Sequence, residues 1–250
     1  MSLLRINGLG KVYGKGKACT QALKQVDLEV NKADFVAIMG ASGSGKSTLL
    51  NLISTIDKPT HGEIWINNIN IAKLNNAKAD SFRKSQLGFI FQDFRLLDSL
   101  TISENIAVPL IIQKRNKEHI EHRIAEVMDM LSISKLRDKY PYQISGGEKQ
   151  RAACARAIIA EPELILADEP TGSLDSNNAH NIMRVMTEFN EKLKATILMV
   201  THDPMSASYC KRVIFLKDGN IINFVERENN VQNDFYKIIV EHNSKLQQAN

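Results

Sequence analysis

The stretch DFVAIMGASGSGKSTLLNL, residues 34–52, decides the fold of this chain. It opens with a short apolar run that ends in glycine, which predicts a buried strand, and from Lys46 it continues as a predicted helix. Between the two lies GASGSGKS, residues 40–47, which matches the pattern G-x-x-x-x-G-K-[ST]. Glycines let backbone N–H groups surround an anion, and the following helix adds its positive end. The strand–loop–helix context therefore predicts a phosphate-binding loop rather than a glycine-rich turn without a ligand.

The side chains of this loop predict binding of a nucleoside triphosphate with magnesium. Lys46 can reach the β- and γ-phosphates, and the Ser47 hydroxyl can bind Mg²⁺. The residues expected to bind the nucleotide here are Gly40, Ser42, Gly43, Gly45, Lys46, Ser47 and Thr48.

Two carboxylates follow another apolar run. LILADE, residues 164–169, predicts a buried strand that ends in Asp168 and Glu169. Asp168 is placed to hold the Mg²⁺ shell, and Glu169 can orient or deprotonate an attacking water. A solvated strand end is the alternative for such a pair, but the phosphate loop favours the catalytic interpretation.

Three further side chains stand at the ends of predicted strands. Gln92 ends LGFIFQ, and His202 follows ILMVT. Ligands of open α/β sheets bind at the carboxyl ends of strands, so we expect both residues in the site rather than in purely structural positions. Tyr13, in KVYGKG, could stack on an adenine ring, although a tyrosine beside a glycine is also common at strand ends.

Strands alternate with helices over the whole chain, which predicts a single α/β domain. The phosphate loop adds the expectation of a P-loop NTPase (RecA-like) core. The first 30 residues predict an antiparallel β subdomain, and residues 102–160 turn helical, with an apolar stripe at Ile120, Ile124, Val127 and Leu131. We expect a nucleotide-binding core of residues 1–92 and 156–250, interrupted by a helical subdomain at 93–155. Further expected elements are strands at 62–68 and 196–202, a helix at 177–193, an Asp-Gly hairpin turn at 217–220 and a helix in the tail.

Composition excludes several classes of protein. The 250 residues are 43% hydrophobic and 24% charged, with a net charge of +4, which is ordinary for a globular domain and gives no reason to expect nucleic-acid binding. The sequence has no apolar run long enough to cross a membrane, and the N-terminus is not expected to be a signal peptide. Cys19, Cys154 and Cys210 are odd in number and far apart, so we expect buried, reduced thiols and no metal site.

A second glycine-rich helix start, ISGGE at 144–148, completes a larger pattern. Together with the order GASGSGKS, Gln92, LILADE, LDS and His202, it resembles the ATP-binding-cassette ATPase family, whose signature is usually written LSGGQ. The resemblance covers nearly the whole chain. It implies that two copies pack head to tail and that each ATP lies between the phosphate loop of one copy and the signature of the other.

Residue roles follow from this resemblance. Ser145, Gly146 and Gly147 would hold the γ-phosphate of ATP bound to the second copy, and Asp175, in SLDS, would lie along the seam between the copies. The expected catalytic residues are Glu169, His202, Gln92 and Lys46, and the expected ligands of Mg²⁺ are Ser47, Gln92 and Asp168. Glu148 departs from the glutamine that is usual in the signature, and a carboxylate near a triphosphate is electrostatically unfavourable unless it points to ribose or a cation. Some members of the family share this glutamate, so we do not expect it to inactivate the site.

Longer stretches of the sequence narrow the resemblance to one group within the family. LISTIDKPTHGEIWI, KYPYQISGGEKQRAACARAII and VTHDPMSASYCKRVIFLKDG are similar to cassettes of the lipoprotein-release and macrolide-export group. Within that group they are most similar to the cassettes of bacitracin- and lantibiotic-type peptide resistance systems of bacteria. This implies a peripheral protein on the cytoplasmic face of the membrane, bound to an integral membrane permease and, through it, associated with a sensor histidine kinase. The segment 93–105 is the expected docking surface for the permease.

Other functions stay open at this point. A lipoprotein-release or macrolide-export cassette would carry the same ATPase residues, and so would a regulatory or division-type scaffold. A DNA-repair or chromosome-organising cassette is less compatible, because those usually carry long coiled-coil or zinc insertions and the insertion here is short and poor in cysteine.

Overall fold

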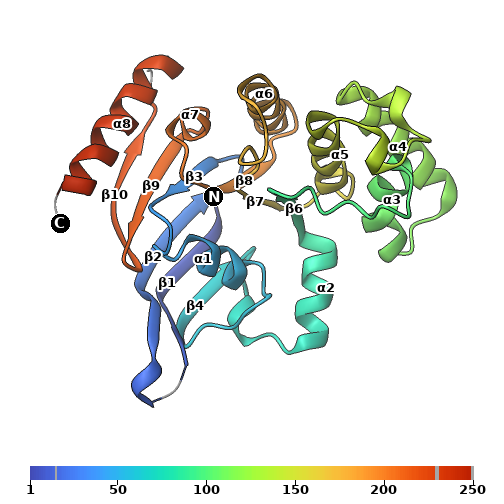
Figure 1. The fold of residues 1–250 in the computed structure, drawn as a ribbon. Helices are drawn as coiled ribbons and strands as arrows, with labels where there is room; N and C mark the ends of the chain where they lie inside the picture. The colour runs from blue at the N-terminus through green and yellow to red at the C-terminus, as the bar shows by residue number, and fades with distance from the viewer. Residues whose placement is uncertain (15, 229–230, 249–250) are drawn as a thin grey trace. The chain divides into compact units, whose positions relative to one another are not determined.

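The computed structural model describes residues 1–14, 16–228 and 231–248, and the chain divides into two compact units (Figure 1). Unit 1 comprises Met1–Ala79 and Thr196–Asn250, and unit 2 comprises Asp80–Ala195. Each unit is described by itself. The narrower helical subdomain at 93–155 stays a prediction.

The first sheet of unit 1 is antiparallel, as the sequence predicts. Its order is β2-β1-β4-β5, formed by β1 (Ser2–Tyr13), β2 (Thr20–Asn31), β4 (His61–Ile66) and β5 (Ile69–Asn70). Leu4, Ile6 and Leu9 of β1 are buried, whereas Arg5 on the same strand is exposed. The alternation gives this sheet one apolar face and one face turned to water.

The second group of strands in unit 1 has the order β10-β9-β3-β8. It is formed by β3 (Phe35–Met39), β8 (Thr196–Thr201), β9 (Arg212–Lys217) and β10 (Asn220–Glu226). β3 lies parallel to β8 and β9, and all five of its residues are buried, as expected for a strand covered on both faces. Asp218 and Gly219 join β9 to β10 with φ of 47° and 77°, the conformation of the predicted Asp-Gly hairpin turn.

The helices of unit 1 pack on these sheets. They are α1 (Lys46–Ile53), α7 (Pro204–Ala207) and α8 (Gln232–Gln248), with 3₁₀ turns η1 (Gly16–Ala18) and η2 (Ile71–Lys73). α1 contacts both β2 and β8, and α8 contacts α7 and buries Phe235 and Ile239 completely. Figure 1 shows α8 running alongside β9 and β10.

Unit 2 is mainly helical. It contains the parallel strands β6 (Leu87–Phe91) and β7 (Leu164–Asp168), the helices α3 (Ile102–Ile112), α4 (Lys117–Met130), α5 (Gly146–Ile158) and α6 (Ser176–Lys192), and the 3₁₀ turns η3 (Ser134–Leu136) and η4 (Pro141–Gln143). α5 contacts α3, α4, α6 and β6, so the signature helix lies at the centre of this unit. Of the predicted apolar stripe, Ile124, Val127 and Leu131 are buried and Ile120 is half-buried.

Two helices were not predicted from the sequence, the four-residue α7 and the longer α2. α2 (Asn76–Gln86) spans the division between the units, and its sequence NAKADSFRKSQ buries only Ala79 and Phe82. Its apolar residues, Ala77, Ala79 and Phe82, are too few for a helical stripe, which is why the periodicity did not reveal α2.

The expectation of three buried thiols is wrong for one of them. Cys154 and Cys210 are fully buried, but Cys19, immediately before β2, is exposed. Its neighbours Ala18, Thr20 and Gln21 are exposed as well, so there is no core for the thiol to enter.

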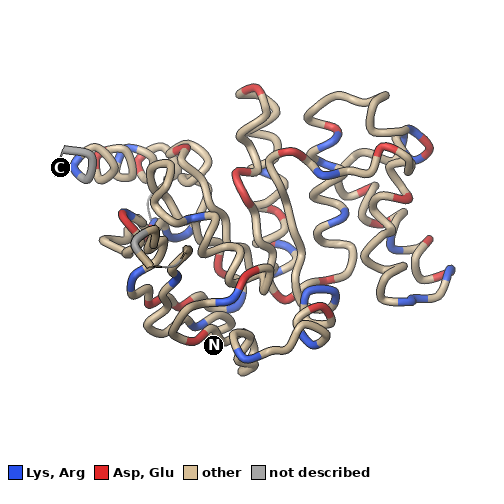
Figure 2. Tube along the Cα trace, turned by 60° about the horizontal axis from the view of Figure 1, so that its bottom comes forward, with Lys and Arg blue, Asp and Glu red and all other residues tan. Residues whose placement is uncertain are grey.

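The distribution of charged residues and the hydropathy of the helices bear on possible partners. Figure 2 shows acidic and basic residues interspersed along the chain trace. In the part of the chain that the structure describes, no helix has both the length and the apolar character needed to cross a lipid bilayer.

Candidate functional site

The predicted phosphate loop joins β3 to α1 in unit 1. Gly45 stands immediately before the helix with φ of 106°, and a Cβ at this position would lie 2.6 Å from the carbonyl oxygen of Ala22. Only glycine fits such a backbone and such a close approach. The Lys46 ammonium donates hydrogen bonds to the carbonyl oxygens of Gly40 (2.7 Å) and Ala41 (3.0 Å), so the cation lies within the curve of the loop.

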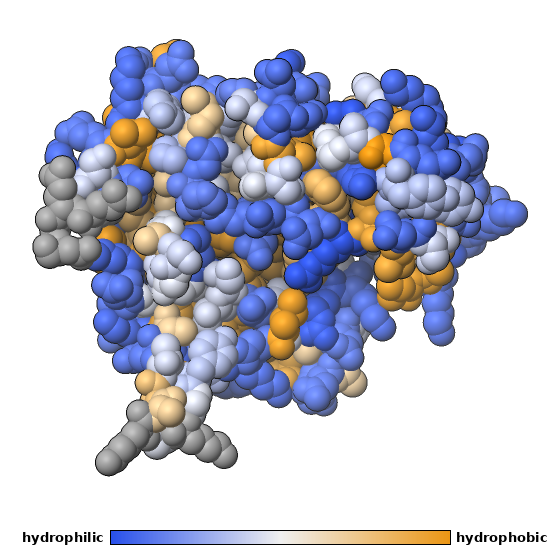
Figure 3. All heavy atoms as spheres, in the orientation of Figure 1, coloured by the Kyte–Doolittle hydropathy of each residue, from blue (hydrophilic) through white to orange (hydrophobic). Residues whose placement is uncertain are grey.

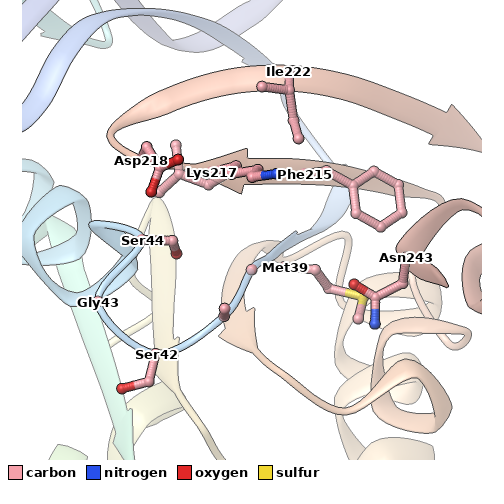
Figure 4. Close-up of a pocket in the computed structure, with 12 residues that line it drawn as sticks. Met39, Ser42, Gly43, Ser44, Phe215, Lys217, Asp218, Ile222 and Asn243 are labelled. Carbon is pink, nitrogen blue, oxygen red and sulfur yellow. The ribbon is translucent and has the colours of Figure 1, made fainter. Parts of the chain in front are cut away.

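The first half of the loop also borders a pocket of about 230 Å³ (Figure 4). Its other walls come from β9, from β10 and from Asn243 of α8. The hydroxyl of Ser44 is buried at this pocket and has no hydrogen-bond partner among the described residues. Ser42 is exposed on the same half of the loop. The loop thus keeps polar groups that a bound anion and its waters could satisfy.

The other expected site residues of unit 1 lie close to the loop in the fold. Met39, which precedes the loop, pairs with Thr201 in the parallel register of β3 and β8, so Gly40 and His202 leave neighbouring strands at the same edge. His202 is exposed there. Tyr13 ends β1 and is 40% exposed, and the Thr48 side chain of α1 is close enough to influence the pKa of its phenol. Unit 1 therefore brings the loop, His202 and Tyr13 to one region.

Unit 2 brings Gln92 to the acidic strand end. Phe91 pairs with Asp168 in the parallel register of β6 and β7, so Gln92 leaves β6 beside the residue that precedes Glu169. The backbone carbonyl of Gln92 accepts a 2.7 Å hydrogen bond from the Ser173 hydroxyl. Glu169 itself has φ of 46°, a left-handed conformation that is uncommon for a residue with a side chain and that recurs at functional sites.

The signature residues form the N-terminus of α5. Ser145 is the N-cap, and its hydroxyl and backbone N–H both donate to the carboxylate of Glu148, at 2.9 and 3.0 Å. These bonds, led by the one from the Ser145 backbone, hold the pKa of Glu148 below its ordinary value although partial burial opposes them. Ser145 and Gly146 are exposed, whereas Gly147 is buried.

Gly147 is buried because the next helix covers it. A Cβ on Gly147 would lie 2.1 Å from the Oδ1 atom of Asn178 in α6. The same Asn178 side chain donates a 2.6 Å hydrogen bond to Asp175, the N-cap of α6. The signature and the SLDS segment are therefore in contact within unit 2, through a side chain that the sequence analysis did not single out.

The oxygen groups of the site suit magnesium. Ser47, Gln92 and Asp168 offer a hydroxyl, an amide oxygen and a carboxylate, and Mg²⁺ prefers a few such ligands together with water and substrate phosphates. No three His, Cys, Asp or Glu side chains among the described residues are grouped so that they could hold a metal by themselves. Ser47 belongs to unit 1, whereas Gln92 and Asp168 belong to unit 2.

Comparison with known protein families identifies the family to which these motifs belong. The model of the family described as "ABC transporter" matches residues 23–172, from β2 through the acidic strand end. The chain belongs to the ABC transporter family. Its predicted α/β P-loop fold, with an antiparallel β subdomain, is that of the ATPases of this family.

The relatives of this ABC ATPase cover almost its whole length. It is 50% identical over 98% of its residues to the ATP-binding protein YvcR of Bacillus subtilis, covering 95% of that protein. It is 48% identical over 96% of its residues to the bacitracin export ATP-binding protein BceA of Halalkalibacterium halodurans, again covering 95% of the relative.

A solved structure agrees with these sequences. The dimeric ATP-binding cassette MJ0796 bound to ADP and phosphate superimposes with a TM-score of 0.82 at 39% identity, over 90% of this chain and 98% of that one. The resemblance stated from the motifs is thus confirmed at the level of the family and of its bacitracin-export and lipoprotein-release members.

Three residues that hold the site together were not predicted from the sequence. Asp57 contacts Tyr13, Asn178 contacts Gly147, and Gln150 of α5 donates a 2.6 Å hydrogen bond to the carbonyl of Pro170 beside Glu169. Of the three, only Asp57 could have been found from the sequence, because it lies in STIDKP, a stretch that carries the family resemblance but has no assigned chemistry.

Proposed function

We propose that this ABC ATPase powers a membrane permease in the export or detoxification of peptide antibiotics of the bacitracin and lantibiotic type. The observation that carries the proposal is the 48% identity to a bacitracin export ATP-binding protein over 96% of the chain. Specificity for the peptide would lie in the permease, and this chain would supply the free energy of ATP hydrolysis.

Nucleotide binding begins at the phosphate loop. The backbone of Gly40–Ser47 wraps the phosphates, the Lys46 ammonium exchanges its carbonyl partners for phosphate oxygens, and Tyr13 stacks on the base. The support for this step is the position of the ammonium inside the loop, 2.7 Å from the Gly40 carbonyl oxygen.

Hydrolysis requires a base beside the γ-phosphate. Glu169 accepts a proton from the attacking water, while Gln92 and His202 orient that water and the leaving phosphate. When bound, Mg²⁺ supplies positive charge against the phosphate oxygens, with Ser47, Gln92 and Asp168 as its expected ligands. The contact of Gln92 with the loop after Glu169 supports a shared role for these residues.

A second copy of the chain completes each site. Ser145 and the N–H groups of Gly146 and Gly147 bind the γ-phosphate held by the partner copy, with Asp175 along the seam. Support comes from the exposure of Ser145 and Gly146 at a helix N-terminus and from the dimeric state of the related cassette MJ0796.

The permease docks on unit 2, on the cytoplasmic face of the membrane, and the sensor histidine kinase is reached through it. Leu97 of the expected docking segment 93–105 is exposed, and outside that segment so are Ile111 and Ile112 at the end of α3 and Met130 at the end of α4. Figure 3 shows apolar surface on the α3–α4 part of the molecule. Exposed apolar groups of this size are typical of surfaces that bind another protein.

The ATPase assignment is tested by substituting Glu169. Glu169→Gln keeps the size of the side chain but removes the base, so turnover is expected to fall at least about a hundredfold while ATP still binds. ATP should then hold the variant as a dimer in size-exclusion chromatography. Glu161→Gln, the same change at an exposed glutamate of unit 2, is the control and should hydrolyse ATP at the parent rate. Parent-rate hydrolysis by Glu169→Gln would refute the catalytic assignment.

The peptide-resistance assignment needs a test in the host. Deletion of the coding gene should lower the minimal inhibitory concentration of bacitracin or of a lantibiotic, and the parent chain, but not Glu169→Gln, should restore it. A lipoprotein-release role is the second candidate, because the chain is also 37% identical over 87% of its residues to the lipoprotein-releasing protein LolD of Bordetella pertussis. Unchanged peptide susceptibility together with mislocalised lipoproteins would favour that role.

A further inference from the structure

The loop that follows α1 folds back against the end of β1. Its sequence, STIDKPT at 54–60, belongs to the phrases that mark the resemblance but have no assigned chemistry. The backbone N–H of Thr60 donates to the carbonyl of Gly10 (2.9 Å), and the N–H of Val12 donates to the Thr60 hydroxyl (2.9 Å). Two hydrogen bonds thus fix the loop beside the strand that carries Tyr13.

Asp57 in this loop binds two side chains of β1. One carboxylate oxygen accepts hydrogen bonds from the Lys11 ammonium (2.6 Å) and the Lys58 backbone N–H (2.7 Å). The other oxygen accepts the Tyr13 hydroxyl at 2.8 Å. The Lys11 ammonium donates a further bond to the carbonyl of Lys58, at 2.7 Å. The Tyr13 side chain is therefore held at both ends, by the strand at its Cα and by Asp57 at its hydroxyl.

Lys11 also occupies one face of the Tyr13 ring. Its ammonium lies 4.7 Å from the ring centroid, in a cation–π contact. The Lys11 side chain is only 12% exposed, whereas Tyr13 is 40% exposed. A base that stacks on this tyrosine must use the face that Lys11 leaves uncovered.

The protonation states of Tyr13 and Asp57 preserve the hydrogen bond between them, which tethers the tyrosine ring to the loop. Partial burial, followed by the bond to Asp57, raises the pKa of Tyr13, so the phenol stays protonated and remains a donor. Partial burial alone would raise the pKa of Asp57, but the bonds from Lys11, Tyr13 and the Lys58 backbone together lower it. A neutral phenol facing a carboxylate is the arrangement that a donor–acceptor tether needs.

We propose that Asp57 is a positioning residue for the nucleotide base: it anchors the Tyr13 hydroxyl and the Lys11 ammonium so that the base stacks on the ring face opposite Lys11. The inference rests on the proposed ATP-binding function. The anchored Tyr13 ring has already lost side-chain conformational entropy before the nucleotide binds, so ordering the ring costs less binding free energy. Because the hydroxyl is engaged by Asp57, the ring contributes to binding by stacking.

The test compares two ligands, ATP and inorganic tripolyphosphate, in equilibrium titrations of the purified chain. Tripolyphosphate reaches the phosphate loop but has no base. Asp57→Ala and Tyr13→Phe, which keeps the ring and removes the tether, should each weaken ATP binding about three- to tenfold, the range for one hydrogen bond. Both should bind tripolyphosphate as the parent does. KM for ATP should rise by the same factor with kcat unchanged.

A double variant separates positioning from general damage. If Asp57 acts through the tyrosine hydroxyl, Asp57→Ala adds little to the loss in a Tyr13→Phe background. Asp27→Ala is the matched control, since the Asp27 carboxylate also binds β1, but through the backbone N–H of Gly8, and its loss should leave ATP affinity unchanged. Should Asp57→Ala fail to fold, Tyr13→Phe alone must still show the loss for ATP only.

Three results would overturn the inference alone: equal losses for ATP and tripolyphosphate, full additivity of the two substitutions, or parent affinity for ATP in both single variants. Failure of the parent chain to bind ATP would instead overturn the proposed function.

Discussion

The carboxylate of Glu148 occupies the donors of Ser145: it lies 2.9 Å from the hydroxyl and 3.0 Å from the backbone nitrogen of the signature serine. In this arrangement the donors of the signature serine bind a carboxylate of their own helix, α5, instead of a phosphate. A γ-phosphate that uses the Ser145 hydroxyl must compete with that carboxylate and must also approach its negative charge.

Glu148→Gln should therefore strengthen the ATP-bound dimer. An amide oxygen still accepts from Ser145, but the repulsion of the phosphate is gone, so the dimer dissociation constant in the Glu169→Gln background should fall about three- to tenfold. Analytical ultracentrifugation with ATP measures it. An unchanged dissociation constant would mean that the departure from glutamine is neutral.

The same pair predicts a pH dependence of stability. The pKa of Glu148 is lowered in the folded chain, so its contribution is complete above the ordinary glutamate pKa and is lost as the pH falls through the folded value. The melting temperature of the parent should therefore decrease more steeply on acidification below about pH 4.5 than that of Glu148→Gln, which has no carboxylate to protonate. Parallel profiles for the two proteins would contradict this.

The two glycines of the signature should differ sharply in their tolerance of alanine. A Cβ on Gly147 would meet Asn178 at 2.1 Å and break its bond to Asp175, so Gly147→Ala should destabilise the protein by about 1–2 kcal/mol despite the better helix propensity of alanine. A Cβ on Gly146 meets only Leu174 and Phe94, at 3.8 and 3.9 Å, so Gly146→Ala should be neutral or stabilising. Urea denaturation of both variants measures the difference, and equal stabilities would refute the explanation.

Gln150 should be important for stability although it lies outside the expected site. Its side-chain amide is completely buried and donates to the carbonyl of Pro170 at 2.6 Å. Gln150→Met keeps the volume but leaves that carbonyl unpaired, so unfolding should become easier by about 1–3 kcal/mol. Gln86→Met, at the end of α2, is the control, because Gln86 makes only weak bonds to Ser85. A Gln150→Met variant as stable as this control would show that the buried bond contributes little.

The cysteines should react unequally with a thiol reagent. Burial raises the pKa of Cys154 to about 12 and that of Cys210 well above its ordinary value, whereas Cys19 is exposed. The native chain should incorporate one equivalent of iodoacetamide and the denatured chain three, as measured by mass spectrometry. Cys19→Ser should abolish the native reaction, and any further rapid labelling would contradict the burial of the other two.

Local patterns were sufficient to predict most elements of the fold. β3, β7 and β8 are short apolar runs with nearly every residue buried, and α5 follows a serine and opens with two glycines before a helical run, so each carries its signal within a few residues. α2 had no such signal because its surface is almost entirely polar. Cys19 was wrongly expected to be buried because a single cysteine does not reveal whether its strand end has a core beside it.

The sequence by itself determined the identity of the chemical groups. The phosphate loop, the pair Asp168 and Glu169, and the signature at Ser145 are each contiguous, because an anion is bound by neighbouring backbone groups and a strand delivers adjacent carboxylates to its own end. Their spacing and order were enough to indicate an ABC ATPase.

The tertiary structure alone decided which side chains hold these groups in place. Tyr13 and Asp57 are 44 residues apart, Gln92 and Ser173 are 81 apart, and Gly147 is shielded by a residue of the next helix. Such contacts depend on how helices and strands pack, and hydrogen bonds between distant segments leave no periodic trace in the chain. The reactive groups could therefore be identified from the sequence alone, whereas the residues that position them could be identified only from the tertiary structure.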